Sequence, residues 1–281
     1  MQQKVGIFND PMTRSEPSDH ARPIGLFDSG VGGLTVARHI LEELPAERLI
    51  CIADCLHAPY GTKKKAAVEE RCVTLCDYLI SKRVKAIVVA CNTATAAAIS
   101  CLRSLYVIPI IGMEPAVKPA VLLTHTGIVG VLATAGTLNS DKFNRLQEEH
   151  GRSVQIITQC CPGLVELVEE GNLNGIETRR LATRYLDPLL ARGADTIVLG
   201  CTHYPFLLPL LREIAGPKVQ ILDTGIPVSR EVRRQLEIRN LQAPLGNQGG
   251  LEIFTSGNTE SVRNIGSGLL GYSLQVSPLE V

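Results

Sequence analysis

Two cysteines, Cys91 and Cys201, each end an apolar, β-branched run and each precede small polar side chains, in "AIVVACNTAT" (86–95) and "DTIVLGCTHYP" (195–205). A thiolate can act as nucleophile, metal ligand or proton acceptor, although a free cysteine with a pKa of ~8.5 is mostly protonated at neutral pH. Two opposed cysteines permit a further reaction. One removes a proton as a thiolate while the other donates a proton as a thiol, which inverts a stereocentre without a cofactor.

The residues that follow the two cysteines suit the binding of a small carboxylate. In "CNT" (91–93) and "CTH" (201–203), amide, hydroxyl and imidazole groups join the backbone N–H groups as hydrogen-bond donors. His203 could share the proton load of its neighbouring cysteine, and Asp28, at the end of another apolar run, could do the same for the other cysteine.

Two glycine-containing loops are candidates for binding the same ligand. "DSGVGG" (28–33) is GxGG rather than GxGxxG and lacks a P-loop lysine, so it favours a loop for a small anion, with Ser29 as donor, over a nucleotide site. "HAPYGTK" (57–63) could present the Gly61 N–H while Tyr60 forms a pocket wall. The alternatives are a tight turn in the first case and a plain loop with a half-buried tyrosine in the second.

The elements around these residues alternate between strands and helices. A strand is predicted over 23–28, a turn over 29–33, a helix over 34–44 and a strand over 48–54. This alternation favours a parallel α/β sheet, in which ligands bind beyond the carboxyl ends of the strands. Four candidate residues are predicted at such ends: Asp28, Cys91, Thr134 and Cys201.

An internal repeat suggests that the chain folds as two related α/β units. Ile87 and Ile197 are 110 residues apart, as are Cys91 and Cys201, and the predicted strands at 109 and 220 keep nearly the same offset. Chance similarity between parallel strands is the alternative. If the units face each other, one cleft receives a cysteine from each side.

Composition limits the functional class. The 281 residues fit about two domains, and 28 basic residues balance 28 acidic ones without a long run of either sign, so neither nucleic acid nor a charged membrane surface is an expected partner. No secretion signal or transmembrane run is recognised, which favours a cytoplasmic protein. The nine cysteines are expected to be reduced thiols, and their spacing does not predict a metal site.

Several motifs together resemble the bacterial glutamate racemases of the aspartate/glutamate racemase family. They are "FDSGVGGLTV", "PYGTK", "VVACNTAT", "VLATAGT", "LVEEG" and "LGCTHYP", within about residues 23–275. The resemblance implies two similar parallel-sheet α/β domains with the active site in the cleft between them, and no pyridoxal phosphate or metal. It predicts a flexible extension over 1–22, a first domain over 23–114 plus 224–281, and a second domain over 115–223. A homodimer is common in the family.

The resemblance also implies roles for individual residues. Cys91 would exchange the α-proton on the D-glutamate face, assisted by Asp28. Cys201 would act on the L-glutamate face, assisted by His203 and by Glu169, for which Glu166 and Glu170 are close alternatives. The positions expected to bind substrate are Asp28, Ser29, Tyr60, Gly61, Asn92, Thr93, Thr134, Thr202 and His203.

The expected activity is therefore glutamate racemisation that supplies D-glutamate for peptidoglycan. The N-terminal extension resembles those of racemases that respond to UDP-N-acetylmuramoyl-alanine, which makes this precursor a candidate activator. Two alternatives remain: a racemase for aspartate or another dicarboxylate, and a binding module on a racemase-like fold, for example one that binds a topoisomerase. The second alternative would be favoured only if one of the two cysteines were missing.

Overall fold

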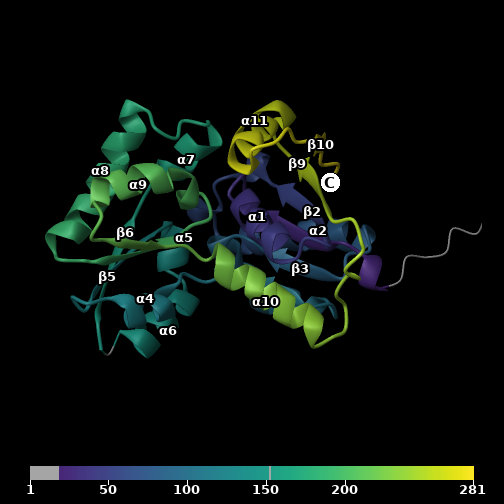
Figure 1. The fold of residues 1–281 in the computed structure, drawn as a ribbon, viewed down its shortest axis with the longest axis horizontal. Helices are drawn as coiled ribbons and strands as arrows, with labels where there is room; N and C mark the ends of the chain where they lie inside the picture. Colours follow the sequence, from purple (N-terminus) through teal and green to yellow (C-terminus); the bar gives the residue numbers. More distant parts are fainter. Residues whose placement is uncertain (1–18, 152) are drawn as a thin grey trace, which may run out of the picture.

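The computed structural model of the protein describes residues 19–151 and 153–281. Of the predicted extension over 1–22, residues 1–18 lie outside the described residues, and the short 3₁₀ helix η1 (Asp19–Ala21) precedes the first strand. The other elements form two parallel sheets, each flanked by helices, and Figure 1 shows the two resulting units side by side. Two parallel α/β units are the fold class that the sequence predicts.

The first unit contains a six-stranded sheet in the order β10-β9-β2-β1-β3-β4, with every neighbouring pair parallel. Its strands are β1 (Ile24–Asp28), β2 (Arg48–Ala53), β3 (Ala86–Val89), β4 (Ile110–Gly112), β9 (Gly250–Thr255) and β10 (Val276–Pro278). Its helices are α1 (Gly33–Glu43), η2 (Cys55–His57), η3 (Tyr60–Thr62), α2 (Lys65–Ser81), α3 (Asn92–Leu105), α10 (Gly225–Glu237) and α11 (Thr259–Leu270).

The second unit contains a four-stranded parallel sheet in the order β6-β5-β7-β8. Its strands are β5 (Ile128–Ala133), β6 (Gln155–Cys160), β7 (Thr196–Gly200) and β8 (Gln220–Leu222). Its helices are α4 (Val117–Leu123), α5 (Ala135–Leu138), α6 (Asp141–His150), α7 (Leu164–Glu169), α8 (Ile176–Ala191), η4 (Tyr204–Leu207) and α9 (Leu208–Ala215). This order repeats β2-β1-β3-β4 of the first sheet, with β7 in the place of β3, as the 110-residue offset predicts.

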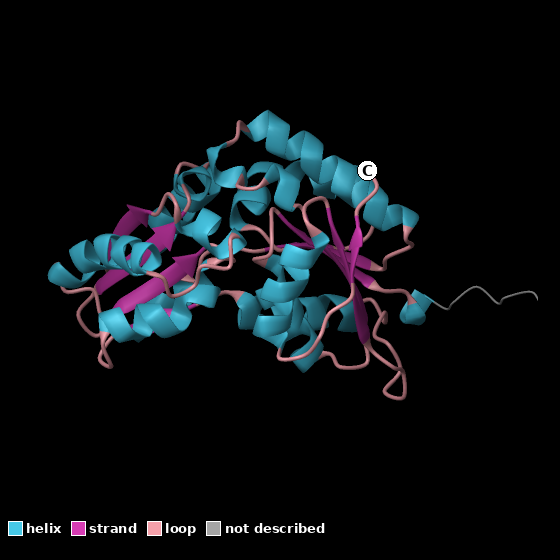
Figure 2. Ribbon diagram, turned by 90° about the horizontal axis from the view of Figure 1, so that it is seen from above, coloured by secondary structure: helices cyan, strands magenta, loops and turns pink. Residues whose placement is uncertain are grey.

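The central strands are apolar at nearly every position because helices cover both faces of each sheet (Figure 2). β1, β3 and β7 are buried at every residue. Asp28, the last residue of β1, is polar, and yet its carboxyl group is completely buried. Because a buried carboxyl group is costly without hydrogen-bond partners, polar groups must surround it at this edge of the sheet.

The chain passes from the first unit to the second after β4 and returns after β8. Residues of both crossings, among them Glu114, Pro115 and Thr224, line one groove, so the crossings lie side by side. The strands of the first sheet come from 24–112 and 250–278, and those of the second come from 128–222. The division of the chain into domains at 114/115 and 223/224 stays a prediction.

Candidate active site

The loops after β1, β3, β5 and β7 meet in one small cavity between the two units. The cavity holds about 10 Å³, about the space that one water molecule needs. A ligand as large as an amino acid can enter only when the units move apart. The lining residues are Ser29, Pro59, Tyr60, Gly61, Cys91, Asn92, Thr93, Thr134, Val165, Gly200, Cys201, Thr202 and His203.

Cys91 is placed by the end of β3 and the start of α3. Its Sγ accepts a hydrogen bond from the backbone N–H of Ala94 at 3.5 Å and lies 3.6 Å from Ser29 Oγ. Burial and then the negative charge of Asp28 raise the pKa of the Cys91 thiol well above its ordinary value, and the two hydrogen bonds oppose this shift. In the closed cavity the neutral thiol is therefore the favoured form.

Asp28 lies behind the cavity wall rather than in it. Its Oδ2 accepts a hydrogen bond from Thr202 Oγ1 at 3.2 Å, and its Oδ1 accepts one from Ser29 Oγ at 3.5 Å. Burial raises the pKa of Asp28, although the positive charge of His203 acts in the opposite direction. Asp28 thus connects both units and is a stronger base than an exposed carboxylate.

Cys201 begins a chain of contacts with an imidazole and a carboxylate. Its Sγ is 3.8 Å from His203 Nδ1, and His203 Nε2 is 2.6 Å from Glu169 Oε1. Burial would lower the pKa of His203, but the hydrogen bonds with Cys201 and Glu169 outweigh it and raise the pKa well above its ordinary value. Burial would likewise raise the pKa of Glu169, but the hydrogen bond and charge of His203 lower it. The pair is therefore an imidazolium and a carboxylate.

Of the three candidate glutamates on and after α7, only Glu169 reaches this chain of contacts. Glu166 and Glu170 are exposed, whereas Glu169 Oε1 also accepts a hydrogen bond from the backbone N–H of Val31 at 2.7 Å. Val31 belongs to the first unit, just before α1. Glu169 therefore orients His203 and also joins the two units.

A cluster of threonine hydroxyls lies where α3 of the first unit meets α5 of the second. Thr93 of α3 lies 2.8 Å from Thr134 and 3.3 Å from Thr137, and the last two are 3.1 Å apart. The two bonds of Thr93 run between the first unit and the start of α5 in the second. Backbones also approach closely here, since a Cβ on Gly136 would lie 3.2 Å from the carbonyl oxygen of Gly61.

Asn92 is the polar side chain of the cavity that has no partner. Both its Oδ1 and its Nδ2 are buried without a hydrogen bond. An unpaired buried amide is costly unless a ligand satisfies it. The side chain is therefore available to both donors and acceptors of a polar ligand.

Most of the predicted site residues line the cavity, and Asp28 and Glu169 support it from behind. The sequence prediction missed other residues: Pro59, Val165 and Gly200 of the lining, Thr137, and Val31, which donates through its backbone. Val165 could have been found because it stands four residues before Glu169, on the same face of a helix. A backbone donor such as Val31 leaves no signal in its side chain.

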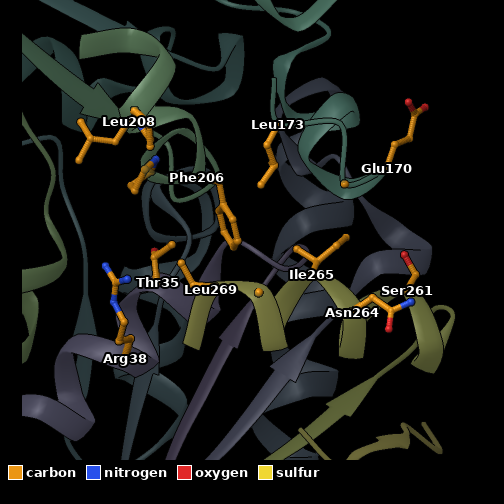
Figure 3. Close-up of a pocket in the computed structure, with 14 residues that line it drawn as sticks. Thr35, Arg38, Glu170, Leu173, Phe206, Leu208, Ser261, Asn264, Ile265 and Leu269 are labelled. Carbon is orange, nitrogen blue, oxygen red and sulfur yellow. The ribbon is translucent and has the colours of Figure 1, made fainter. Parts of the chain in front are cut away.

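A larger cavity of about 660 Å³ lies nearby, between α1, α11, the end of α7 and the η4–α9 segment (Figure 3). Figure 3 shows Phe206 pointing toward α11, between Leu269 and Ile265. Arg38 and Glu170 are its charged lining residues. Among the candidate site residues, this cavity is lined by Glu170 alone, the alternative to Glu169 for which no contact with His203 is found, and its wall is mainly apolar.

Within residues 19–151 and 153–281, no group of three or more His, Cys, Asp or Glu residues is arranged to hold a metal ion. No helix in this described part of the chain has the length and apolar character needed to cross a membrane.

Comparison with known proteins gives consistent relatives. Residues 24–226 match the sequence profile described as Asp/Glu/Hydantoin racemase. The glutamate racemase of Methylococcus capsulatus is 52% identical over 244 residues, which are 85% of this chain and 88% of that protein.

Two solved structures share the fold over nearly their whole length. A glutamate racemase isoform from Bacillus anthracis has a TM-score of 0.84 at 32% identity, covering 92% of this chain and 98% of that one. The Escherichia coli glutamate racemase in complex with L-glutamate and the activator UDP-MurNAc-ala has a TM-score of 0.80 at 32% identity, covering 92% of this chain and 97% of that one.

Proposed function

The chain belongs to the Asp/Glu/Hydantoin racemase family, and on this premise we propose that it is a cofactor-independent glutamate racemase. The observation that carries the proposal is the meeting of Cys91 and Cys201, one from each unit, in a single closed cavity. The relatives named above are glutamate racemases, and they match this chain over most of their length.

Two proton transfers account for the reaction. With D-glutamate, the Cys91 thiolate removes the α-proton and the Cys201 thiol delivers a proton to the opposite face, which leaves L-glutamate, a Cys91 thiol and a Cys201 thiolate. With L-glutamate, the same steps run in reverse. Each turnover thus leaves the two cysteines in the protonation states that the opposite direction requires.

The groups behind each cysteine have distinct roles in these transfers. Asp28, whose pKa burial raises, takes the proton of the Cys91 thiol before the reaction begins. On the other side, protonated His203 lies beside Cys201 and stabilises its thiolate, while Glu169 holds the imidazolium in place. Asp28 thereby supplies a Cys91 thiolate in a site where burial raises the pKa of that thiol.

Donors around the cavity stabilise the carboxylates and the charge that develops at the α-carbon. Asn92, Thr93, Thr134 and Gly61 line the cavity and are the proposed donors, with Ser29 and Thr202 near the two cysteines. Electrostatic interactions of this kind are strongest where water is excluded. The small volume of the closed cavity meets that condition.

We further propose that the D-glutamate formed supplies peptidoglycan synthesis and that UDP-N-acetylmuramoyl-alanine activates the enzyme. The structure of the E. coli relative is described as containing this activator. Assembly as a homodimer stays a prediction from the family resemblance, and location in the cytoplasm stays a prediction from the sequence. Racemisation rates with and without the precursor, in the full chain and in a chain lacking residues 1–18, test the regulatory part.

The central experiment follows α-proton exchange in D₂O. Wild-type protein and the Cys91→Ala and Cys201→Ala variants are incubated with L- or D-glutamate, and optical rotation and α-deuterium are measured. Racemisation with deuterium in the product, lost in either variant, is the expected result. Cys76→Ala, a buried cysteine of α2, is the matched control and should keep its activity. Turnover of aspartate but not glutamate would overturn the substrate assignment, and turnover of neither would favour a binding module.

A further inference from the structure

A second buried carboxylate, Asp54, lies directly after β2, at the same edge of the sheet as Asp28 and Cys91. It is completely buried, yet it does not line the cavity. Arg71 of α2 donates to it twice, from Nε to Oδ2 at 2.9 Å and from Nη2 to Oδ1 at 2.7 Å. None of the proton transfers proposed above uses this pair.

Two further contacts of Asp54 attach it to the loop that forms one wall of the cavity. The Tyr60 hydroxyl donates to Oδ2 at 2.7 Å, and His57 Nδ1 lies 3.1 Å from Oδ1. The Tyr60 ring is 1% exposed and lines the cavity. Because the hydroxyl proton is donated to Asp54, Tyr60 cannot donate that proton to a ligand.

The same loop is one of the places where the first unit touches the second. A Cβ on Gly61 would lie 2.7 Å from Thr134 Cβ, and a Cβ on Gly136 would lie 3.3 Å from Gly61 Cα. The 3₁₀ helix η3 therefore packs directly on the start of α5. A displacement of η3 by one ångström would change both the wall of the cavity and the surface on which the units close.

We propose that Asp54 and Arg71 are positioning residues that hold η3 in place, so that Tyr60 and Gly61 form the cavity wall and the two units can close on the substrate. This inference rests on the proposed racemase function and deepens it. Neither residue touches the ligand; both act through Tyr60 and the loop. Their effect should therefore fall on substrate binding more than on proton transfer.

Charge compensation gives the pair a distinctive signature. The titratable groups that face Asp54 are Arg71 of α2, Tyr60 of η3, His57 of η2 and the buried Cys72 of α2. Burial alone would raise the pKa of Asp54, but the hydrogen bonds from Arg71 and Tyr60 outweigh it and lower the pKa. Without Arg71, the ionised carboxylate would keep its contacts with Tyr60 and His57 but would be buried without its arginine partner.

The test compares Arg71→Met with the double variant Asp54→Asn/Arg71→Met. In Arg71→Met, we expect KM for glutamate to rise by about tenfold or more while kcat changes less than about threefold, a loss of binding rather than of transition-state stabilisation. The KM ratio to wild type should grow as the pH rises from 6 to 9, because ionisation of Asp54 without its arginine partner loosens the loop. The double variant has no such charge and should regain much of the lost affinity, without that pH dependence.

A control and a second readout separate this inference from the function on which it rests. Arg180→Met removes a bidentate pair with Glu177 on the exposed face of α8 and should leave KM unchanged. Alkylation of Cys91 by iodoacetamide, followed by peptide mass spectrometry, does not require turnover. Since Cys91 is 5% exposed and shares the cavity with Tyr60, its labelling should be faster in Arg71→Met and return toward the wild-type rate in the double variant.

The outcomes are distinguishable. A wild-type protein that does not racemise glutamate would overturn the proposed function, and the labelling rates would then decide the positioning role alone. With an active wild type, unchanged KM and unchanged Cys91 labelling in a folded Arg71→Met variant would overturn the positioning role. A loss confined to kcat, or a double variant no better than the single one, would do the same.

Discussion

Replacing Glu169 by glutamine removes one charge and leaves the shape of the side chain unchanged. The carbonyl oxygen of the new amide can still accept the hydrogen bond that the Val31 N–H makes to Oε1 at 2.7 Å. The 2.6 Å contact with His203 loses its anionic partner. The variant Glu169→Gln therefore tests the charge on the carboxylate rather than the packing of α7.

The size of the effect follows from the type of bond that is lost. A hydrogen bond to a charged group contributes about 1.5–3 kcal/mol. At 1.36 kcal/mol per factor of ten, this corresponds to a decrease of roughly 10- to 150-fold in kcat/KM. Because the two enantiomers are equally stable in water, their equilibrium constant is one, and kcat/KM must fall by the same factor in both directions.

The pH profile should also change in a defined direction. The pKa of His203 is raised by its hydrogen bonds with Cys201 and Glu169, against the effect of burial. Loss of the carboxylate lets this pKa fall, so that the imidazolium deprotonates earlier and the alkaline limb of kcat/KM moves to lower pH. Initial rates by polarimetry, measured from both enantiomers at several pH values, provide the data.

Glu170→Gln is the matched control, since this neighbour is exposed and has no contact with His203. The reasoning would be refuted if Glu169→Gln kept its activity within about threefold of wild type while remaining folded, an effect below that of one charge-assisted bond. An equal loss in Glu170→Gln would refute it as well, because a general charge effect would then explain the result.

Three further predictions concern stability and closure. Lys85→Met breaks a fully buried ion pair, in which Lys85 Nζ lies 2.6 Å from Glu47 Oε2. Urea denaturation should show a free energy of unfolding lowered by about 3–5 kcal/mol, and a loss below about 1 kcal/mol would contradict the pairing. Asp195 accepts three hydrogen bonds from the loop before β5, which lower its pKa to about 2 despite the opposing effect of burial. The difference in free energy of unfolding between wild type and Asp195→Asn should therefore be constant above pH 5 and shrink as the pH falls toward 2. A difference that persists at pH 2 would contradict this role of the carboxylate. Gly61→Ala places a Cβ 2.7 Å from Thr134 Cβ and should raise KM for glutamate by about tenfold without reducing stability. A KM within twofold of wild type would show that closure does not depend on this contact.

The architecture could be predicted from the sequence because its signals are local and repeated. The apolar runs that end in Cys91 and Cys201 are β3 and β7, which hold equivalent positions in the two sheets. A parallel sheet then fixes where the side chains after each strand must lie. The position of the cysteines at the cavity follows from strand order alone.

Other parts of the site depend on contacts that no local pattern contains. "LVEEG" offers two adjacent glutamates, and only the position of α7 determines that Glu169 rather than Glu170 reaches His203. The pairing of Asp54 with Arg71 joins a strand end to a helix 17 residues away. Tyr60 was predicted to form a pocket wall, but no pattern around it indicates that its hydroxyl is held from behind.

The chain crosses between the two units after β4 and again after β8, and because these crossings lie side by side, a rotation of one unit about them is the simplest opening motion. Such a rotation would separate the cavity walls and break contacts between the units, among them those of Glu169 with Val31, of Thr93 with Thr134 and of Thr202 with Asp28. No strand pairing in either sheet has to be disturbed. Since the closed cavity cannot admit an amino acid, each catalytic cycle must contain one opening and one closing of the units. The rate of this motion sets an upper limit on the turnover number, and that limit does not depend on the basicity of either thiol.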